Sequence, residues 1–384
     1  MFICFKNFIV IVLIIIPVVL LSQINKIENS FNLYEKGNFE QAVKEINFAA
    51  NNSYSKDLAI TWYYRGQIYQ ALYQENENKV YGLDSAYVSL VKALKFDKDK
   101  KYLKNIIIQF KLLSSNYYRR GAIDFNNEKY FLAYKSFEKA LDINKTPLVA
   151  KADTMLIFYS AKAAQFSNKL SKAKKHYNKL VYLKYSNSDV YINLGDIYKN
   201  ENNSTKAAEI YSKGFSYGNQ KNMELINRLI NIYLTHGKTS EALKYITAGK
   251  IVEPDNAGLY FYEADLYNTQ KQENKARNSY INGLKYESNN YNANHNLGLI
   301  LYNSAIKHKI EADKYKNSDL NKYKTEINKY NKEIMQALKY LEIAYKMNQK
   351  DRKLNYCLIE VYKLLNRDDD YKRIIVLMKA NGID

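Results

Sequence analysis

The sequence predicts an all-α solenoid, a fold in which similar helical hairpins stack one after another along the chain. Its 384 residues include only 3 Pro and 13 Gly, and 47% are hydrophobic, which favours helices joined by short turns. Two sets of mostly small residues also recur at steps of 34 or 35: Gly195, Ile230, Ala264 and Gly298, then Ala207, Ala242 and Ala276. Because one hairpin cannot bury its apolar face alone, a fixed period of this kind indicates a stack.

Aromatic residues keep the same phase as the small ones. Three tyrosines follow members of the first set by three residues, and two tyrosines and an isoleucine follow the second set by four: Tyr198, Tyr233, Tyr267, Tyr211, Ile246 and Tyr280. This pattern resembles the tetratricopeptide repeat, abbreviated TPR below. The resemblance implies a right-handed α-solenoid of about nine TPR helical hairpins, in which the first helices of the hairpins line a concave surface that binds extended peptides.

In chain order, the pattern predicts a signal peptide followed by nine repeats. Their approximate limits are 1–22 for the signal and 23–56, 58–100, 102–147, 154–187, 188–221, 223–256, 257–290, 291–350 and 352–384 for the repeats. The first unit is degenerate and covers one end of the stack. The second has an enlarged polar turn over 74–82, and the third begins with one long helix over 102–126. The last unit, with its charged outer face, suits a cap.

The sequence of the eighth unit predicts an elongated hairpin over residues 299–347. Apolar residues from Leu320 to Leu341 step by threes and fours, as in a coiled-coil seam. A helix from Leu320 to Met347 would be about 42 Å long at 1.5 Å per residue, so the hairpin should project beyond its neighbours. Two interpretations stay open: the hairpin is a docking arm or dimer contact, or its two helices bury the seam against each other.

The first 22 residues predict export. Lys6 precedes an apolar run from Phe8 to Leu21, which is short for crossing a bilayer and contains Pro17. Cleavage is expected between Ser22 and Gln23, which predicts a periplasmic or envelope-associated protein. The alternative is an uncleaved anchor in the inner membrane. After cleavage, Cys357 would be the single remaining thiol, so no internal disulfide is expected.

The formal net charge of +19 and the pI of about 9.4 raise the question of nucleic-acid binding. Only 8 of the 58 basic residues are arginine, the better reader of phosphates and bases, and the chain is equally heavy in Asn, Ile and Tyr. This composition favours lysines on solvated helix faces. A basic nucleic-acid or anionic-membrane-surface binding protein remains the alternative interpretation.

No catalytic or metal site is expected. The four histidines, His176, His236, His295 and His308, are scattered and lack ligand spacing. Ser171–Lys174 and Ser304–Lys307 match a Ser-x-x-Lys pair, but with 50 lysines such matches arise by chance. The chain has no Gly-rich phosphate loop. We therefore predict a non-enzyme with no cofactor and no small-molecule substrate.

The resemblance extends to the exported TPR proteins of Bacteroidetes bacteria. Shared features are the export signal, the enlarged second turn, the long helix leading into the third unit, the stretched hairpin, and the segment 348–352 before the last hairpin. The resemblance implies a protein of the Gram-negative cell envelope that acts through protein contacts.

The TPR resemblance also selects candidate partner-binding residues on the concave face, at repeat positions two, five, six and nine: Tyr118, Arg119, Tyr159, Lys162, Asn193, Asp196, Asn227, Arg228, Asn231, Tyr262, Asp265, His295 and Asn296. Amides can pair with a peptide backbone, and Tyr and Arg are common interface anchors. The expected function is a scaffold that holds a peptide or protein partner, with nucleic acid a less favoured ligand. The family's Lys-and-Asn clamp for a carboxyl terminus is missing, which argues against a receptor for chaperone tails.

Overall fold

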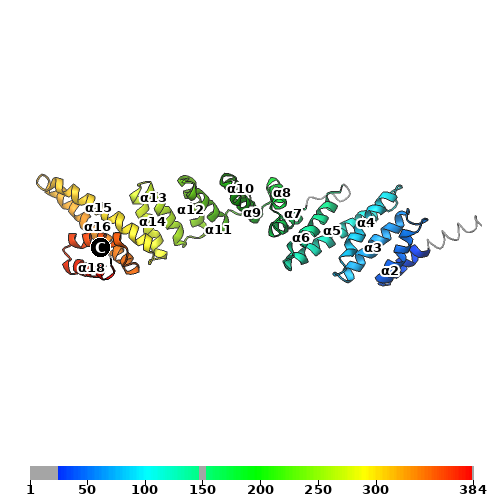
Figure 1. The fold of residues 1–384 in the computed structure, drawn as a ribbon. Helices are drawn as coiled ribbons and strands as arrows, with labels where there is room; N and C mark the ends of the chain where they lie inside the picture. The colour runs from blue at the N-terminus through cyan, green and yellow to red at the C-terminus, as the bar shows by residue number, and fades with distance from the viewer. Residues whose placement is uncertain (1–24, 147–152, 383–384) are drawn as a thin grey trace, which may run out of the picture. The chain divides into compact units, whose positions relative to one another are not determined.

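The computed structural model describes residues 25–146 and 153–382, and within them every regular element is a helix (Figure 1). The all-α fold class predicted from the sequence is confirmed: consecutive helices pair as antiparallel hairpins, and one hairpin is much longer than the rest. The expected signal peptide, 1–22, lies outside the described residues. None of the described helices combines the length and apolarity needed to cross a bilayer.

The chain divides into two compact units, which are described separately. The first unit holds a helix over residues 25–35 and then α2 Phe39–Asn51, α3 Ala59–Glu75, α4 Tyr81–Phe96, α5 Leu103–Asn126, α6 Tyr130–Asn144, α7 Thr154–Phe166, α8 Leu170–Tyr182 and most of α9 Ser188–Asn200. The long helix expected over 102–126 is α5. The loop between α3 and α4 covers only residues 76–80, because both helices extend further than the polar composition of 74–82 indicated.

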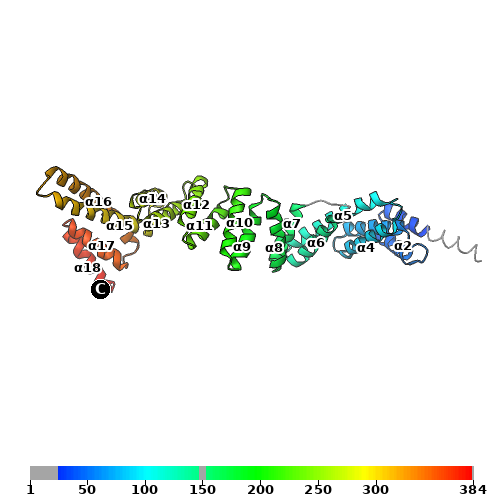
Figure 2. The same cartoon turned by 90° about the horizontal axis from the view of Figure 1, so that it is seen from above.

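The second unit holds the remaining helices, which Figure 1 and Figure 2 show from two sides. They are α10 Ser204–Tyr217, α11 Met223–Thr235, α12 Thr239–Val252, α13 Ala257–Thr269, α14 Glu273–Tyr286, α15 Tyr291–Tyr315, α16 Leu320–Met347, α17 Arg352–Leu364 and α18 Asp368–Ala380. The helix expected from Leu320 to Met347 is α16. Helices α15 and α16 make the most extensive contact of any pair, and their seam continues into the core shared with α14, α17 and α18.

Small residues mark the places where helices approach most closely. Ala207 and Ala242 have no exposed surface, and Gly195 is buried as well. A Cβ atom added to Gly298 would lie 2.7 Å from two side-chain atoms of Leu341, and one added to Gly66 would lie 2.7 Å from Leu90. The periodic small residues are therefore required by close helix packing, as the sequence pattern predicted.

Most of the hairpin turns contain one residue with left-handed backbone conformation. The residues are Gly37, Glu128, Asn168, Asn202, Gly237, Lys271 and Asn366, with φ between +54° and +75°. From position 168 to position 271 they keep steps of 34, 35 and 34 residues. In the described chain, the two hairpins without such a residue in the turn are α3–α4 and α15–α16, whose connections were the ones expected to be unusual. The left-handed residue stops one helix and lets the next begin antiparallel to it.

Replacing Gly237 by alanine is expected to lower the free energy of unfolding by about 1 kcal/mol, because a Cβ disfavours the left-handed region. A new Cβ there would meet no atom within 4 Å, so the loss would come from the backbone alone. Urea denaturation followed by circular dichroism measures it. Gly258→Ala, inside helix α13, is the matched control and should cost nothing measurable. An equally stable Gly237→Ala protein would contradict this account of the turns.

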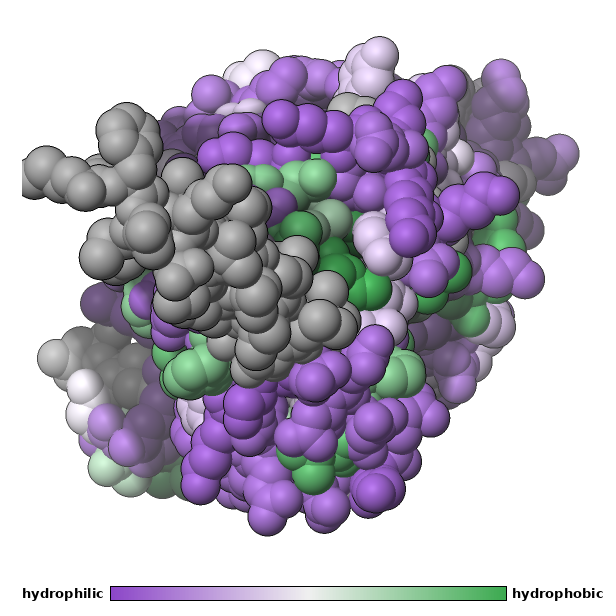
Figure 3. Space-filling model, turned by 90° about the vertical axis from the view of Figure 1, so that its right-hand side faces the viewer, coloured by the Kyte–Doolittle hydropathy of each residue, from purple (hydrophilic) through white to green (hydrophobic). Residues whose placement is uncertain are grey.

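Most of the visible surface is polar. On the face shown in Figure 3, hydrophilic residues cover most of the area outside the grey atoms, and apolar residues show in smaller areas between them. Many lysines also lie over aromatic rings, such as the Lys92 ammonium 3.8 Å from the Trp62 ring centroid. The lysine-rich composition therefore serves largely to solvate helix faces, with lysine stems covering aromatic surface.

Candidate functional site

In the first unit, the candidate residues Tyr118 and Tyr159 belong to an aromatic patch. Their rings lie 6.1 Å apart at 71°, and both pack on Phe137 at 5.8 and 6.1 Å. Phe125 and Phe166 extend the patch, and Phe166 is 54% exposed. We call Tyr118, Phe125, Phe137, Tyr159 and Phe166 the aromatic patch. Phe137 is fully buried, while the half-buried rings of Tyr118, Phe125 and Tyr159 and the exposed ring of Phe166 offer a contact area whose side chains are already ordered.

A cavity of about 490 Å³ opens beside the aromatic patch, between α5, the end of α6 and the start of α7. Its lining is Lys111, Ser114, Ser115, Tyr118, Asn144, Asp153, Met155 and Leu156. The Met155 side chain is 54% exposed, and its sulfur lies 3.9 Å from the Tyr118 hydroxyl. Burial, with the nearby Tyr159 and Asp153, raises the pKa of Tyr118, so its hydroxyl stays a neutral donor. The lining mixes polar side chains with Tyr118, Met155 and Leu156, and the cavity is large enough for one side chain of a peptide.

Charged candidates flank this patch but already have partners. Arg119 is exposed and forms an ion pair with Glu77 at 2.6 Å. The Lys162 ammonium lies 3.8 Å from the Asp189 carboxylate and 5.4 Å from the centroid of the Phe158 ring. A bound acidic group would therefore have to compete with these carboxylates. Exposed ion pairs of this type are weak, so replacing one of these carboxylates by an acidic group of a partner would cost little free energy.

The two candidates on α9 differ from the tyrosines in being partly committed to packing. Asn193 is half-buried and hydrogen-bonds the Tyr177 side chain, whose pKa is raised mainly by burial and then by Asp189, while the Asn193 bond opposes the shift. Asp196 is half-buried too. Asn193 thus helps hold α8 and α9 together.

In the second unit, α11 and α13 present the most accessible candidates. Asn227 and Asn231 are exposed one turn apart, and Arg228 between them pairs with Glu224 at 2.9 Å. Tyr262, on α13, is 46% exposed. Two amides at this spacing on one helix face can hydrogen-bond consecutive peptide groups of an extended chain.

Two further candidates, Asp265 and Asn296, belong to a hydrogen-bond network inside the protein. The Tyr280 hydroxyl donates to Asp265 Oδ1, and Asn296 Nδ2 donates to Tyr280 Oη at 3.1 Å and to Asp265 Oδ1 at 3.5 Å. This network joins α13, α14 and α15. Asp265 and Asn296 therefore lie next to each other, and Asp265 Oδ1 and Asn296 Nδ2 already form hydrogen bonds inside the protein.

His295 has one ring nitrogen without a hydrogen bond. Its ring stacks on Tyr291 with centroids 5.7 Å apart, and within the described residues its buried Nε2 finds no partner. Burial lowers the pKa of His295, Asp351 acts in the opposite direction and Lys353 adds to the lowering. The ring is therefore neutral at pH 7, and Nε2 can accept or donate one hydrogen bond depending on the tautomer.

A row of amides on the first helices of the second and third hairpins was not among the sequence candidates. Gln70 Nε2 donates to Gln109 Oε1 at 2.9 Å, and Asn116 Nδ2 donates to Gln70 Oε1 at 3.3 Å. Gln74 Nε2 continues the row to Asn116 Oδ1 at 3.4 Å. The repeat phase that selected Tyr118 selects Tyr63, Tyr64 and Gln67 on α3 instead, so it did not find this row.

The groups that resembled catalytic pairs are engaged in ion pairs. Lys174 contacts Glu201 at 2.6 Å and Lys307 contacts Glu273 at 2.8 Å, so neither is a free base beside its serine. Burial, then the Glu360 charge, raises the pKa of the Cys357 thiol to about 11, which suppresses its reactivity. In the part of the chain that the structure describes, no group of three or more His, Cys, Asp or Glu side chains could hold a metal ion.

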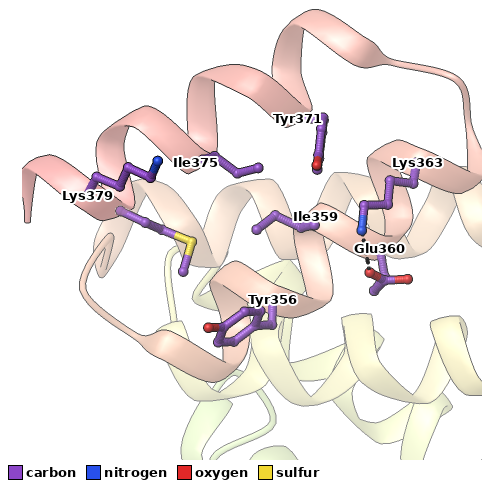
Figure 4. A pocket seen from close by; sticks show the side chains of 8 residues that line it. Tyr356, Ile359, Glu360, Lys363, Tyr371, Ile375 and Lys379 are labelled. Carbon is purple, nitrogen blue, oxygen red and sulfur yellow. Dashed lines mark hydrogen bonds and ion pairs between the residues drawn. The ribbon is translucent and has the colours of Figure 1, made fainter. Parts of the chain in front are cut away.

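Two other cavities lie away from the candidate residues. A cavity of about 860 Å³ is lined by residues of α4, α5 and α6 together with Val80, and inside it the Tyr117 hydroxyl donates to Asp84 at 2.7 Å. A smaller one, of about 380 Å³, lies between α17 and α18 (Figure 4). In that view Ile359 and Ile375 point toward each other, while Lys363 turns to Glu360 at 3.1 Å. Neither cavity is lined by any of the candidate partner-binding residues.

No family model and no curated protein matches the sequence. Solved structures of TPR proteins do match. The C-terminal part of a TPR repeat-containing protein from Cytophaga hutchinsonii is 14% identical, with 85% of this chain and 97% of that chain covered and a TM-score of 0.39. YrrB, described as a TPR protein with an unusual peptide-binding site, is 14% identical over 45% of this chain and 86% of its own, with a TM-score of 0.36.

A third similar structure is MamA from Desulfovibrio magneticus, which is 12% identical over 48% of this chain and 94% of its own, with a TM-score of 0.31. Identities and scores this low carry no function from one protein to another.

Proposed function

We propose that this protein is a non-catalytic scaffold that binds a peptide or protein partner on the face formed by the first helices of its hairpins. The aromatic patch and its neighbouring cavity support this proposal most strongly. They combine ordered aromatic rings, an exposed thioether and hydroxyl donors within one small area. Aromatic anchors beside a pocket that accepts one side chain are typical of energetically dominant points in an interface.

The partner we propose is an extended segment with at least one apolar or aromatic side chain. In the first unit, the aromatic patch would receive the apolar side chain. In the second unit, taken by itself, the exposed amides of α11 can supply hydrogen bonds to the backbone of an extended segment. Lysines and arginines near both places favour a segment with some acidic residues. The proposed location is the periplasm or cell envelope, after removal of residues 1–22, and an uncleaved inner-membrane anchor is the alternative.

The proposal is tested by crosslinking in cells, affinity recovery and mass spectrometry of the wild-type chain and variants. Tyr159→Ala and the charge reversals Arg119→Glu and Arg228→Glu should each reduce recovery of the same partner, by about tenfold for the tyrosine. Helical circular dichroism should not change, because all three side chains lie at the surface or half-buried.

Arg373→Glu is the matched control for the charge reversals, since Arg373 is 67% exposed on α18. If every variant recovered the partner as well as the wild-type protein does, this face would not be the binding surface. Recovery of nucleic acid instead of protein, abolished by nuclease, would support the alternative of a basic nucleic-acid binder.

A further inference from the structure

The end of the α15–α16 hairpin exposes an apolar residue that continues a buried seam. Along α16, Ile334 is fully buried, Tyr330 is 7% exposed, Ile327 is half-buried, and Leu320 is 59% exposed. Together with Tyr323, which is also half-buried, these residues step by threes and fours, so they lie on one face of the helix. Burial fails at Leu320 because α15 ends at Tyr315, and no other described element covers this position.

The hairpin end stands clear of the other helices of its unit. Figure 1 and Figure 2 both show the turn between α15 and α16 beyond α17 and α18. The residues of the turn, 316–319, connect helices of 25 and 28 residues, roughly twice the length of the neighbouring helices of 13 or 14 residues. An exposed leucine at the end of such an arm can reach a surface that the rest of the unit does not touch.

Lysines surround this leucine. Between residues 303 and 332 the chain carries eight lysines and four acidic residues: Lys307, Lys309, Lys314, Lys316, Lys322, Lys324, Lys329 and Lys332, against Glu311, Asp313, Asp319 and Glu326. Lys314 and Lys322 pair with Glu311 and Asp319 at 2.6 and 3.6 Å, while Lys316 and Lys324 make no ion pair in the described structure. The hairpin end is therefore richer in positive charge than the whole chain, whose net charge is +19 over 384 residues.

We propose that this hairpin end, Lys314 to Lys324, binds an anionic lipid bilayer, with Leu320 entering the boundary between headgroups and acyl chains. Lysines attract anionic headgroups, and the apolar side chain gains by leaving water. The residues favour lipid over nucleic acid. The segment 303–332 contains no arginine, and its most exposed apolar residues, Ile310 and Leu320, are aliphatic and cannot stack on bases. This inference does not depend on a partner in the aromatic patch.

Direct contact is tested with the full chain by placing a fluorophore at the hairpin end. With Leu320→Trp, mixing with phosphatidylglycerol-containing vesicles should shift the added indole fluorescence to the blue, and brominated lipid should quench it. Trp62 is buried at 6% exposure, and its background is subtracted using the parent protein. Ile251→Trp is the matched control, because Ile251 is 76% exposed elsewhere in the same unit, and it should show neither effect.

The contribution of the lysines to lipid binding is tested in one variant that replaces four of them with glutamine: Lys314, Lys316, Lys322 and Lys324. Affinity for the anionic vesicles should fall at least about tenfold, and the quenching at position 320 should disappear. The control replaces four exposed lysines of the first unit, Lys95, Lys98, Lys101 and Lys104, and changes the net charge equally. The contact readout is local, so binding through residues 1–22 does not imitate it.

Three outcomes would overturn the proposal. The first is no blue shift at position 320 on any vesicle, and the second is an equal shift on pure phosphatidylcholine vesicles. The third is duplex DNA binding that the four tip substitutions abolish while lipid quenching persists unchanged, which would assign the lysines to nucleic acid.

Discussion

Leu341→Ala is expected to lower the free energy of unfolding by about 2–5 kcal/mol, one of the largest effects of any single truncation in the second unit. Leu341 is fully buried at the centre of the α15–α16 seam, and its side chain fills the space that Gly298 leaves open. Removing three carbon atoms there leaves a cavity that the helices close only in part. Urea denaturation measures the loss, and hydrogen exchange should show it concentrated in α15 and α16.

A double-mutant cycle sharpens this test. Gly298→Ala alone should destabilise by about 1–3 kcal/mol, because its Cβ would lie 2.7 Å from Leu341. With Leu341→Ala present, the added methyl group enters vacated space, so the double variant should lose less than the sum of the two. Met335→Ala, at a 55% exposed position of α16, is the control and should change stability by less than about 0.5 kcal/mol. Strict additivity would show that the two positions do not compete for space.

Arg120→Met is expected to cost about 3–5 kcal/mol, because it leaves a buried carboxylate without its partner. The Arg120 guanidinium donates two hydrogen bonds of 2.8 Å to Asp124, and another of 3.2 Å to the Glu77 carbonyl oxygen. The Asp124 side chain is only 3% exposed. Urea denaturation of the full chain measures the loss.

The neighbouring arginine supplies the control for this prediction. Arg119 also pairs with a carboxylate, at 2.6 Å, but it is 66% exposed, so Arg119→Met should cost less than about 1 kcal/mol. The double substitution Arg120→Met with Asp124→Leu should recover most of the stability, since it removes the buried charge as well. If Arg120→Met were as mild as Arg119→Met, water would have to reach Asp124 in the variant.

The architecture could be predicted because it depends on local spacing. A buried small residue such as Ala207 or Gly298 must recur once per hairpin. In a helix with a buried seam, such as α16, the apolar residues recur every three or four positions. Both patterns can be recognised in a single sequence, because neither depends on contacts between distant residues. The enlarged second turn was predicted less well, because helix α3 extends through Glu75 despite a polar composition that favours a loop.

The candidate site was harder to predict because repeat phase selects a face of a helix and not the partners of each side chain. Repeat phase assigns Asp265 and Asn296 to the predicted face, yet Tyr280 from the intervening helix hydrogen-bonds Asp265 Oδ1 and Asn296 Nδ2. The contact between Gln70 and Gln109 joins residues 39 positions apart, which no spacing rule reveals. The packing of Tyr118 on Tyr159 likewise becomes visible only when two hairpins are placed side by side.

The left-handed turn residues have a consequence for how this chain can diverge. Glycine, asparagine, lysine and glutamate all occupy the same turn position, so what is preserved is a backbone angle and not a particular side chain. The corners of the hairpins can therefore change their surface chemistry freely, while an inserted or deleted residue there would rotate every following helix out of register. Variation at these seven corners should therefore consist of substitutions.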